Sequence, residues 1–109
     1  MPIVAAIRGE SWSPIAGGTT IAGGIASADP PRMGQILAAL RGTDGTAVAV
    51  DDEEIARWRS ALAEREGVYA ESTSAAAFAG LEQLVKDGAI GEGDSVLVPV
   101  TGSGLKESI

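Results

Sequence analysis

The side chains best suited to chemistry lie in two short polar segments. One is the glycine-rich loop Thr101-Gly102-Ser103-Gly104, which directly follows an apolar run, and the other is Glu71-Ser72-Thr73-Ser74, which joins a carboxylate to three hydroxyls. Hydroxyls at a helix start cap the helix in most proteins and bind an anion in a minority. Glu71 is either a solvated turn residue or a group that orients a ligand in a crevice. Both pairs of alternatives stay open from the residues alone.

The composition limits which chemistry is available. The chain has 109 residues and contains neither histidine nor cysteine. Disulfides, zinc sites of the usual nitrogen and sulfur type, and Ser-His or Cys-His nucleophile pairs are therefore excluded, and we expect no metal. The net charge of −7 and the sequence pI of 4.4 argue against a nucleic-acid partner, because phosphate contacts need clustered basic side chains.

Two further patterns are better explained by structure than by chemistry. The spacing from Gly18 to Gly23 fits a phosphate loop, but Gly24-Ile25 stands where lysine and a hydroxyl are required, so nucleotide hydrolysis is excluded. The acidic run Asp51 to Glu54 marks the start of a helix, where carboxylates cap free N–H groups. A cation site is disfavoured there because consecutive helical residues point in different directions.

The apolar pattern alternates between strand-like and helix-like segments. Short β-branched runs predict strands at residues 3–7, 46–50, 68–70 and 95–100. Helical spacing and caps predict helices over about 19–28, from Pro31 to the glycines at 42–45, from Asp51 to Gly67, and over about 72–86. We assign Trp58 and Phe78 to core-facing helical stripes, whereas Trp12 lies in a loop.

This alternation predicts one α/β domain over residues 1–109. Its expected architecture has three layers, with a mostly parallel sheet of about four strands and flanking helices. Ligand sites in such folds lie beyond the carboxyl ends of the strands, which favours the loop after residue 100. No run approaches the ~20 apolar residues of a membrane span and the start lacks a basic region, so we expect a cytoplasmic protein without membrane contact.

Four ordered motifs carry a family resemblance. Residues 20–25 (TIAGGI), 49–55 (AVDDEEI), 69–77 (YAESTSAAA) and 100–106 (VTGSGLK) resemble the carboxyl-terminal region of threonine synthases. These are fold-type-II pyridoxal-phosphate enzymes, related to threonine and serine dehydratases. The resemblance implies that the chain is the carboxyl-terminal portion of a large, cofactor-binding domain.

The same resemblance implies three cofactor-binding residues. Thr101 matches the position whose hydroxyl hydrogen-bonds the pyridine nitrogen, with Gly102 beside it in the loop, and Glu71 lies in a turn near the cofactor. A neutral hydroxyl does not hold that nitrogen protonated as a carboxylate would, which suits β-elimination or replacement. Ser72 stands where the family has a proline.

The lysine that carries the cofactor and the glycine-rich phosphate loop of that family have no counterpart here. The only lysines are Lys86 and Lys106, and neither matches the Schiff-base position. We therefore expect a fragment or subunit of a threonine synthase/dehydratase-like enzyme that acts on a hydroxy- or phospho-amino acid by β/γ-elimination or replacement. It would supply the pyridine-nitrogen side, with no catalytic residue of its own, and be inactive and unable to bind pyridoxal phosphate alone. Its expected partner is a missing amino-terminal half or another copy.

The alternative function is non-catalytic. A small α/β module could bind an anion at Ser72 to Ser74, or regulate a partner, and could self-associate through apolar surface left uncovered by missing strands.

Overall fold

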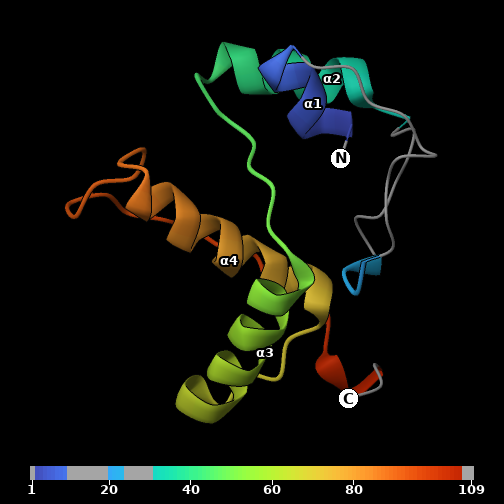
Figure 1. Cartoon of the computed structure of the whole chain (residues 1–109), viewed down its shortest axis with the longest axis vertical. Helices are drawn as coiled ribbons and strands as arrows, with labels where there is room; N and C mark the ends of the chain where they lie inside the picture. Colours follow the sequence, from blue (N-terminus) through green and yellow to red (C-terminus); the bar gives the residue numbers. More distant parts are fainter. Residues whose placement is uncertain (1, 10–19, 24–30, 107–109) are drawn as a thin grey trace. The chain divides into compact units, whose positions relative to one another are not determined.

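The computed structural model describes residues 2–9, 20–23 and 31–106. The chain divides into two compact units, residues 1–19 with 26–49, and residues 20–25 with 50–109. None of the helices in the described ranges is long and apolar enough to cross a membrane. The first unit contains α1 (Pro2–Arg8) and α2 (Met33–Gly42), and the second contains α3 (Asp52–Glu66), α4 (Ser72–Lys86) and the 3-10 helix η2 (Gly104–Lys106) (Figure 1).

The expected parallel sheet is wrong, because the described residues contain no strand. Residues 3–7 lie within α1, and residues 46–50 and 95–100 form no ladder. The expected strand at 68–70 is reduced to an isolated antiparallel bridge between Ala70 and Ser103. A short apolar run has the same pattern in a buried helix and in a strand, and a strand forms only where a neighbour accepts its hydrogen bonds.

The helix predicted after Asp51 is confirmed, with both its caps. The Asp51 carboxylate accepts a hydrogen bond of 2.8 Å from the Glu54 N–H, and Asp52, Glu53 and Glu54 fill the first turn. Gly67 ends the helix in the left-handed region at φ 68°, where a side chain would be strained. These local signals are therefore enough to predict both ends of α3 from the sequence.

Two other helix predictions have different outcomes. The helix expected from Pro31 begins at Met33 instead, with Arg32 at its N-cap position. The helix expected over 19–28 lies mostly outside the described residues, as does Trp12.

The core of the second unit lies where α3 and α4 pack together. Ile55 of α3 contacts Ala75 and Ala76 of α4, together with Ala22 from the segment 20–23. Beside this cluster the rings of Trp58 and Phe78 stack with centroids 5.8 Å apart, which confirms their predicted packing role. The alanines allow the first turns of α4 to approach α3 closely.

The segment 20–23 is fastened to the start of α3. The Thr20 hydroxyl donates to Oδ1 of Asp52 at 2.5 Å, and the Ile21 N–H donates to Oδ2 at 3.1 Å. The described residues 20–23 of the first motif therefore lie beside the amino-terminal turn of α3, in the same compact unit as the motifs at 69–77 and 100–106.

Replacing Asp51 with alanine is expected to lower the free energy of unfolding by about 1 kcal/mol, since the N-cap hydrogen bond is lost. Urea denaturation followed by circular dichroism measures the change. Glu53→Ala is the matched control, because this exposed carboxylate lies in the same turn. It should cost only a few tenths of a kcal/mol. Equal losses in both variants would contradict a specific capping role.

Candidate functional site

The two polar segments singled out in the sequence lie against each other. The Glu71 N–H donates to the Gly102 carbonyl at 3.0 Å, and the Gly104 N–H donates to the Tyr69 carbonyl at 2.7 Å. These bonds flank the bridge between Ala70, which is fully buried, and Ser103. The glycine-rich loop is thus attached to the chain that enters α4.

This pairing brings the Thr101 hydroxyl to the start of α4. Its Oγ1 donates to Oε1 of Glu71 at 3.0 Å and lies 3.0 Å from Oγ of Ser74. The Thr101 N–H also donates to Ser74 Oγ at 2.9 Å. On the other side of the carboxylate, Lys106 forms an ion pair with Oε2 of Glu71. We call these four residues the Thr101 cluster.

Burial in the Thr101 cluster is uneven. Glu71 is 9% exposed and Ser74 is 2% exposed, whereas Thr101 is exposed. A buried charge is tolerated only when it is paired and hydrogen-bonded, and Lys106 and Thr101 supply both. Glu71 is therefore not a solvated turn residue, and the cluster is open to an outside group at Thr101.

Capping of α4, one of the two roles left open for the hydroxyls of Ser72 and Ser74, is not seen at its N-cap position. Glu71 occupies the N-cap position without a side-chain capping bond. Instead, Ser72 accepts a hydrogen bond of 3.0 Å from Arg59 of α3, and Ser74 is bonded to Thr101. Both serines are buried and joined to other parts of the chain, which weighs against the anion site considered above.

The loop glycines make room for neighbouring side chains. A Cβ on Gly102 would lie 2.5 Å from the Glu71 carboxyl carbon, and one on Gly104 would lie 2.6 Å from the Tyr69 ring. The resemblance predicts that Gly102 contacts a cofactor, but the close approach of Glu71 already explains why a glycine stands at this position. Gly102 allows the carboxylate to reach Thr101.

Sequence reasoning found Thr101, Gly102 and Glu71 but missed two members of the cluster. It weighed Ser74 as a helix cap or as part of an anion site, and it considered Lys106 only as a cofactor lysine, whereas the two side chains contact Thr101 and Glu71. The contacts of Ser74 and Lys106 could have been predicted only from the knowledge that residues 69–71 pair with residues 102–104. No local pattern indicates that pairing.

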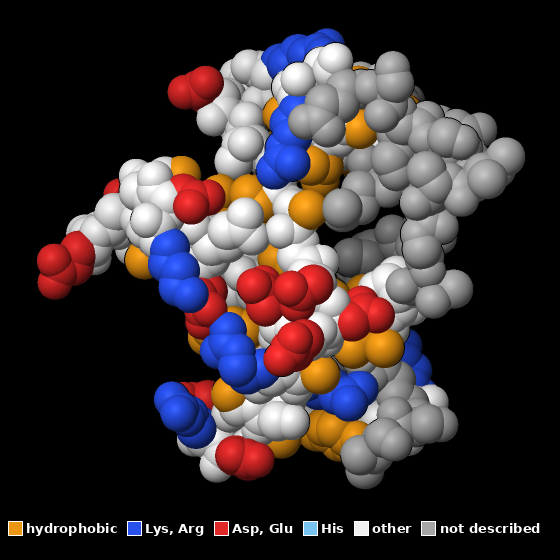
Figure 2. Space-filling model, viewed as in Figure 1, with side chains coloured by type: hydrophobic (Ala, Val, Ile, Leu, Met, Phe, Trp, Pro, Cys, Tyr) orange, Lys and Arg blue, Asp and Glu red, His pale blue; other side chains and the backbone are white. Residues whose placement is uncertain are grey.

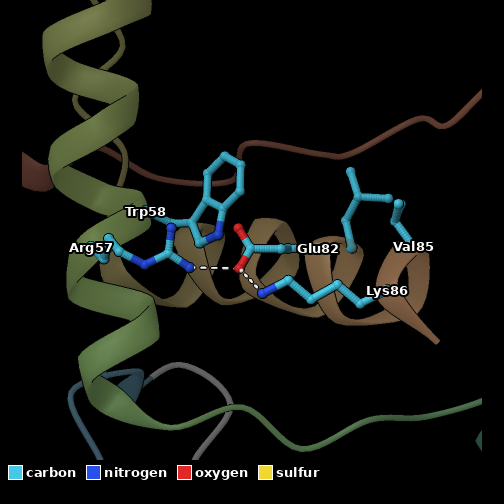
Figure 3. Close-up of a pocket in the computed structure, with 6 residues that line it drawn as sticks. Arg57, Trp58, Glu82, Val85 and Lys86 are labelled. Carbon is cyan, nitrogen blue, oxygen red and sulfur yellow. Dashed lines mark hydrogen bonds and ion pairs between the residues drawn. The ribbon is translucent and has the colours of Figure 1, made fainter.

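A second candidate site is an open groove between α3 and α4 (Figure 3). Its lining residues are Arg57, Trp58, Leu81, Glu82, Val85 and Lys86. Arg57 and Lys86 both reach Oε1 of Glu82, at 2.7 and 3.2 Å. The hydrogen bond from Arg57, with a second from Lys86, lowers the pKa of Glu82 below its ordinary 4.5. The hydrogen bond that Arg57 donates to Glu82 in turn raises the pKa of Arg57.

The groove has the character of ordinary surface rather than of a reactive site. Its two cations share the single carboxylate of Glu82, and such exposed ion pairs contribute little. On the face seen in Figure 2, acidic side chains gather near the middle of the view, with basic side chains beside them. Within the described ranges, no group of three acidic, histidine or cysteine residues could hold a metal ion. The Thr101 cluster remains the better candidate.

Comparison with known proteins gives a consistent family match. The family description "Pyridoxal-phosphate dependent enzyme" matches residues 2–102. The chain is 36% identical to the threonine synthase of Methanocaldococcus jannaschii and 39% identical to that of Methanosarcina acetivorans, each over 108 residues, which are 97% of this chain and 27% of the relative. It is 38% identical over 88 residues to the threonine synthase of Halalkalibacterium halodurans, covering 81% of this chain and 25% of the relative. The chain therefore spans about a quarter of the length of these relatives.

The residues present fit one end of pyridoxal phosphate. An exposed hydroxyl whose orientation is fixed by buried neighbours, as at Thr101, suits a ring nitrogen. The aldehyde end needs an available amine, and both lysines of the chain are ion-paired, Lys106 with Glu71 and Lys86 with Glu82. The hydroxyl of Thr101 is thus placed where it can meet a ring nitrogen.

Gly102→Ala is expected to lower the free energy of unfolding by about 1–3 kcal/mol, because the new methyl group displaces the Glu71 carboxylate. Thermal denaturation measures the loss. Gly93→Ala is the matched control, since no atom lies within 4 Å of its Cβ position. If the two variants are equally stable, the close approach of Glu71 to Gly102 is refuted.

Glu82→Gln is expected to destabilise the chain in a pH-dependent way. Because the folded state lowers the pKa of Glu82, its ionised form stabilises the fold above the ordinary value of 4.5. That contribution disappears as the pH falls through the lowered pKa. Urea denaturation at several pH values should show the gap to wild type shrinking toward acid. Glu92→Gln, at an exposed position, is the control, and a pH-independent gap for Glu82→Gln would argue against the ion pairs.

Proposed function

Because the chain belongs to the family of pyridoxal-phosphate-dependent enzymes, we propose that it supplies the pyridine-nitrogen side of a cofactor site. The observation that carries this proposal is the Thr101 hydroxyl, which is exposed and hydrogen-bonded to buried Glu71 and Ser74. Thr101 binds and orients the ring at its nitrogen. Glu71 sets the orientation of the Thr101 hydroxyl by accepting its hydrogen bond. Gly102 has no side chain and so leaves space for the Glu71 carboxylate.

The proposed reaction is elimination or replacement at the β or γ carbon of a hydroxy- or phospho-amino acid. Support comes from the threonine synthases among the relatives, which match over nearly all of this chain. When bound, pyridoxal phosphate supplies the electron sink for such chemistry. A threonine hydroxyl can bind the ring nitrogen without help from histidine or cysteine, and the chain contains neither residue.

We further propose that the chain is inactive alone and works with a second polypeptide, in the cytoplasm. Its two lysines are engaged in ion pairs, and relatives are about four times as long. The chain between α4 and η2 exposes Val96, Leu97 and Val100, with Leu97 91% exposed. Apolar side chains gathered in this way commonly mark a surface that another chain covers, either the rest of such an enzyme or a second copy.

The test is a hybrid enzyme in which this chain replaces the segment of the Methanosarcina acetivorans threonine synthase that aligns with it. The hybrid loaded with pyridoxal phosphate should form threonine. Thr101→Val should lower kcat/KM by about tenfold, since one hydrogen bond of about 1 kcal/mol or more is lost. Thr101→Ser, which keeps the hydroxyl, should retain most of the activity.

Two outcomes would overturn the proposal. Full activity of the Thr101→Val hybrid would remove Thr101 from the cofactor site. Threonine formation by the isolated chain, or a borohydride-trapped adduct of pyridoxal phosphate at Lys86 or Lys106, would show that the chain is not dependent on a partner.

A further inference from the structure

The side chains that line the groove between α3 and α4 carry more positive than negative charge. Arg57 of α3 and Lys86 of α4 converge on one oxygen, Oε1 of Glu82, at 2.7 and 3.2 Å (Figure 3). A single carboxylate thus faces two cations, whose side chains stay 55% and 72% exposed. Although the whole chain has a net charge of −7, the groove therefore favours an acidic occupant.

The groove also offers apolar surface and a hydrogen-bond donor without a partner. Val85 is 52% exposed beside the half-buried Leu81, so an aliphatic side chain gains contacts there. The indole N–H of Trp58 is buried, and none of the described residues accepts a hydrogen bond from it. A buried donor is costly to leave unsatisfied. An occupant that combines carboxylate oxygens with an aliphatic side chain matches these features.

The same chain carries a segment of this chemistry directly after α4. Glu92 and Asp94 are exposed, and Val96 and Leu97 follow them with 46% and 91% of their surface exposed. Leu97 is the most exposed large hydrophobic side chain in the described ranges. Acidic and apolar groups are therefore presented together on one short stretch of chain.

We propose that the groove between α3 and α4 receives residues 92–97, here called the acidic loop, of a second copy of this chain. The carboxylates of the acidic loop pair with Arg57 and Lys86, and its Leu97 packs against Val85. The acidic loop closely follows the groove residues of α4 in the sequence. A two-fold axis near the end of α4 therefore lets each copy fill the groove of the other, as in an isologous dimer.

A single copy does not make this contact with itself. Glu92, Asp94 and Leu97 are exposed, and none of them lines the groove. Both surfaces are therefore accessible in one molecule, as association between two copies requires. The apolar contact removes surface from water, while the charges at its edge select the partner and its orientation. The inference does not rest on the function proposed above, because the groove shares no residue with the Thr101 cluster.

The first test measures association by sedimentation equilibrium. The wild-type chain should form a dimer in a concentration-dependent way. Lys86→Glu places a like charge against the acidic loop and should weaken the dimer about tenfold, and adding Glu92→Lys should restore most of the affinity. Arg65→Glu is the matched control, since it makes the same charge change at an exposed position of α3 outside the groove. A monomer at every concentration, or equal weakening by Lys86→Glu and Arg65→Glu, would overturn the inference.

The second test uses the absence of cysteine from the chain. Val85→Cys and Leu97→Cys are prepared as separate variants and mixed under oxidising conditions. A disulfide should join one molecule of each, because the proposed contact brings these two positions together. Leu105→Cys is the control for Leu97→Cys, since Leu105 is 83% exposed and lies in η2. Equal yields of cross-linked product with Leu97→Cys and Leu105→Cys would contradict the proposed contact.

The remainder of a longer enzyme is the competing occupant of the groove. A monomeric wild-type chain, together with a hybrid enzyme whose activity is lowered by Lys86→Glu, would assign the groove to that remainder and overturn the inference. The sedimentation and cross-linking experiments involve no cofactor. Their failure would therefore leave the proposed role of Thr101 unaffected.

Discussion

A buried carboxylate is the constraint on which the rest of the second unit depends. Glu71 is covered by the loop that contains Gly102, and its charge must be compensated where water has little access. Lys106 provides the opposite charge and Thr101 provides a proton. Removing Lys106 would leave the Glu71 charge without this partner, and removing the Thr101 hydroxyl would take away one of its hydrogen bonds, so the two chain segments are held together by electrostatic contacts as well as by backbone bonds.

The segment that holds Glu71 also leads into the helix packing of this unit. α4 begins directly after Glu71, and its first turn uses Ser72 and Ser74 to bond Arg59 and Thr101 instead of capping its own N–H groups. The alanines that follow allow α3 to pack closely, with Ile55 and Ala22 completing the core. The start of α4 is therefore both the packing centre of the unit and the support of the Thr101 hydroxyl.

The proposed function requires mainly that the Thr101 hydroxyl is held in a fixed position. A chain without histidine or cysteine has few groups that can do chemistry themselves, and a cofactor that supplies the electronic effect needs mainly to be held and oriented. The cluster offers one exposed hydroxyl whose orientation is set by two buried neighbours. Such preorganisation suits a group that positions a ring.

The sequence by itself determined the local features. The Asp51 cap and Gly67 determine α3, because capping depends on a few adjacent residues, and the motif around Thr101 pointed to its family. Only the tertiary structure decided how distant residues combine. It placed residues 3–7 in a helix and joined Glu71 to Thr101 across thirty positions, because strand pairing and charge compensation depend on partners that no local pattern contains.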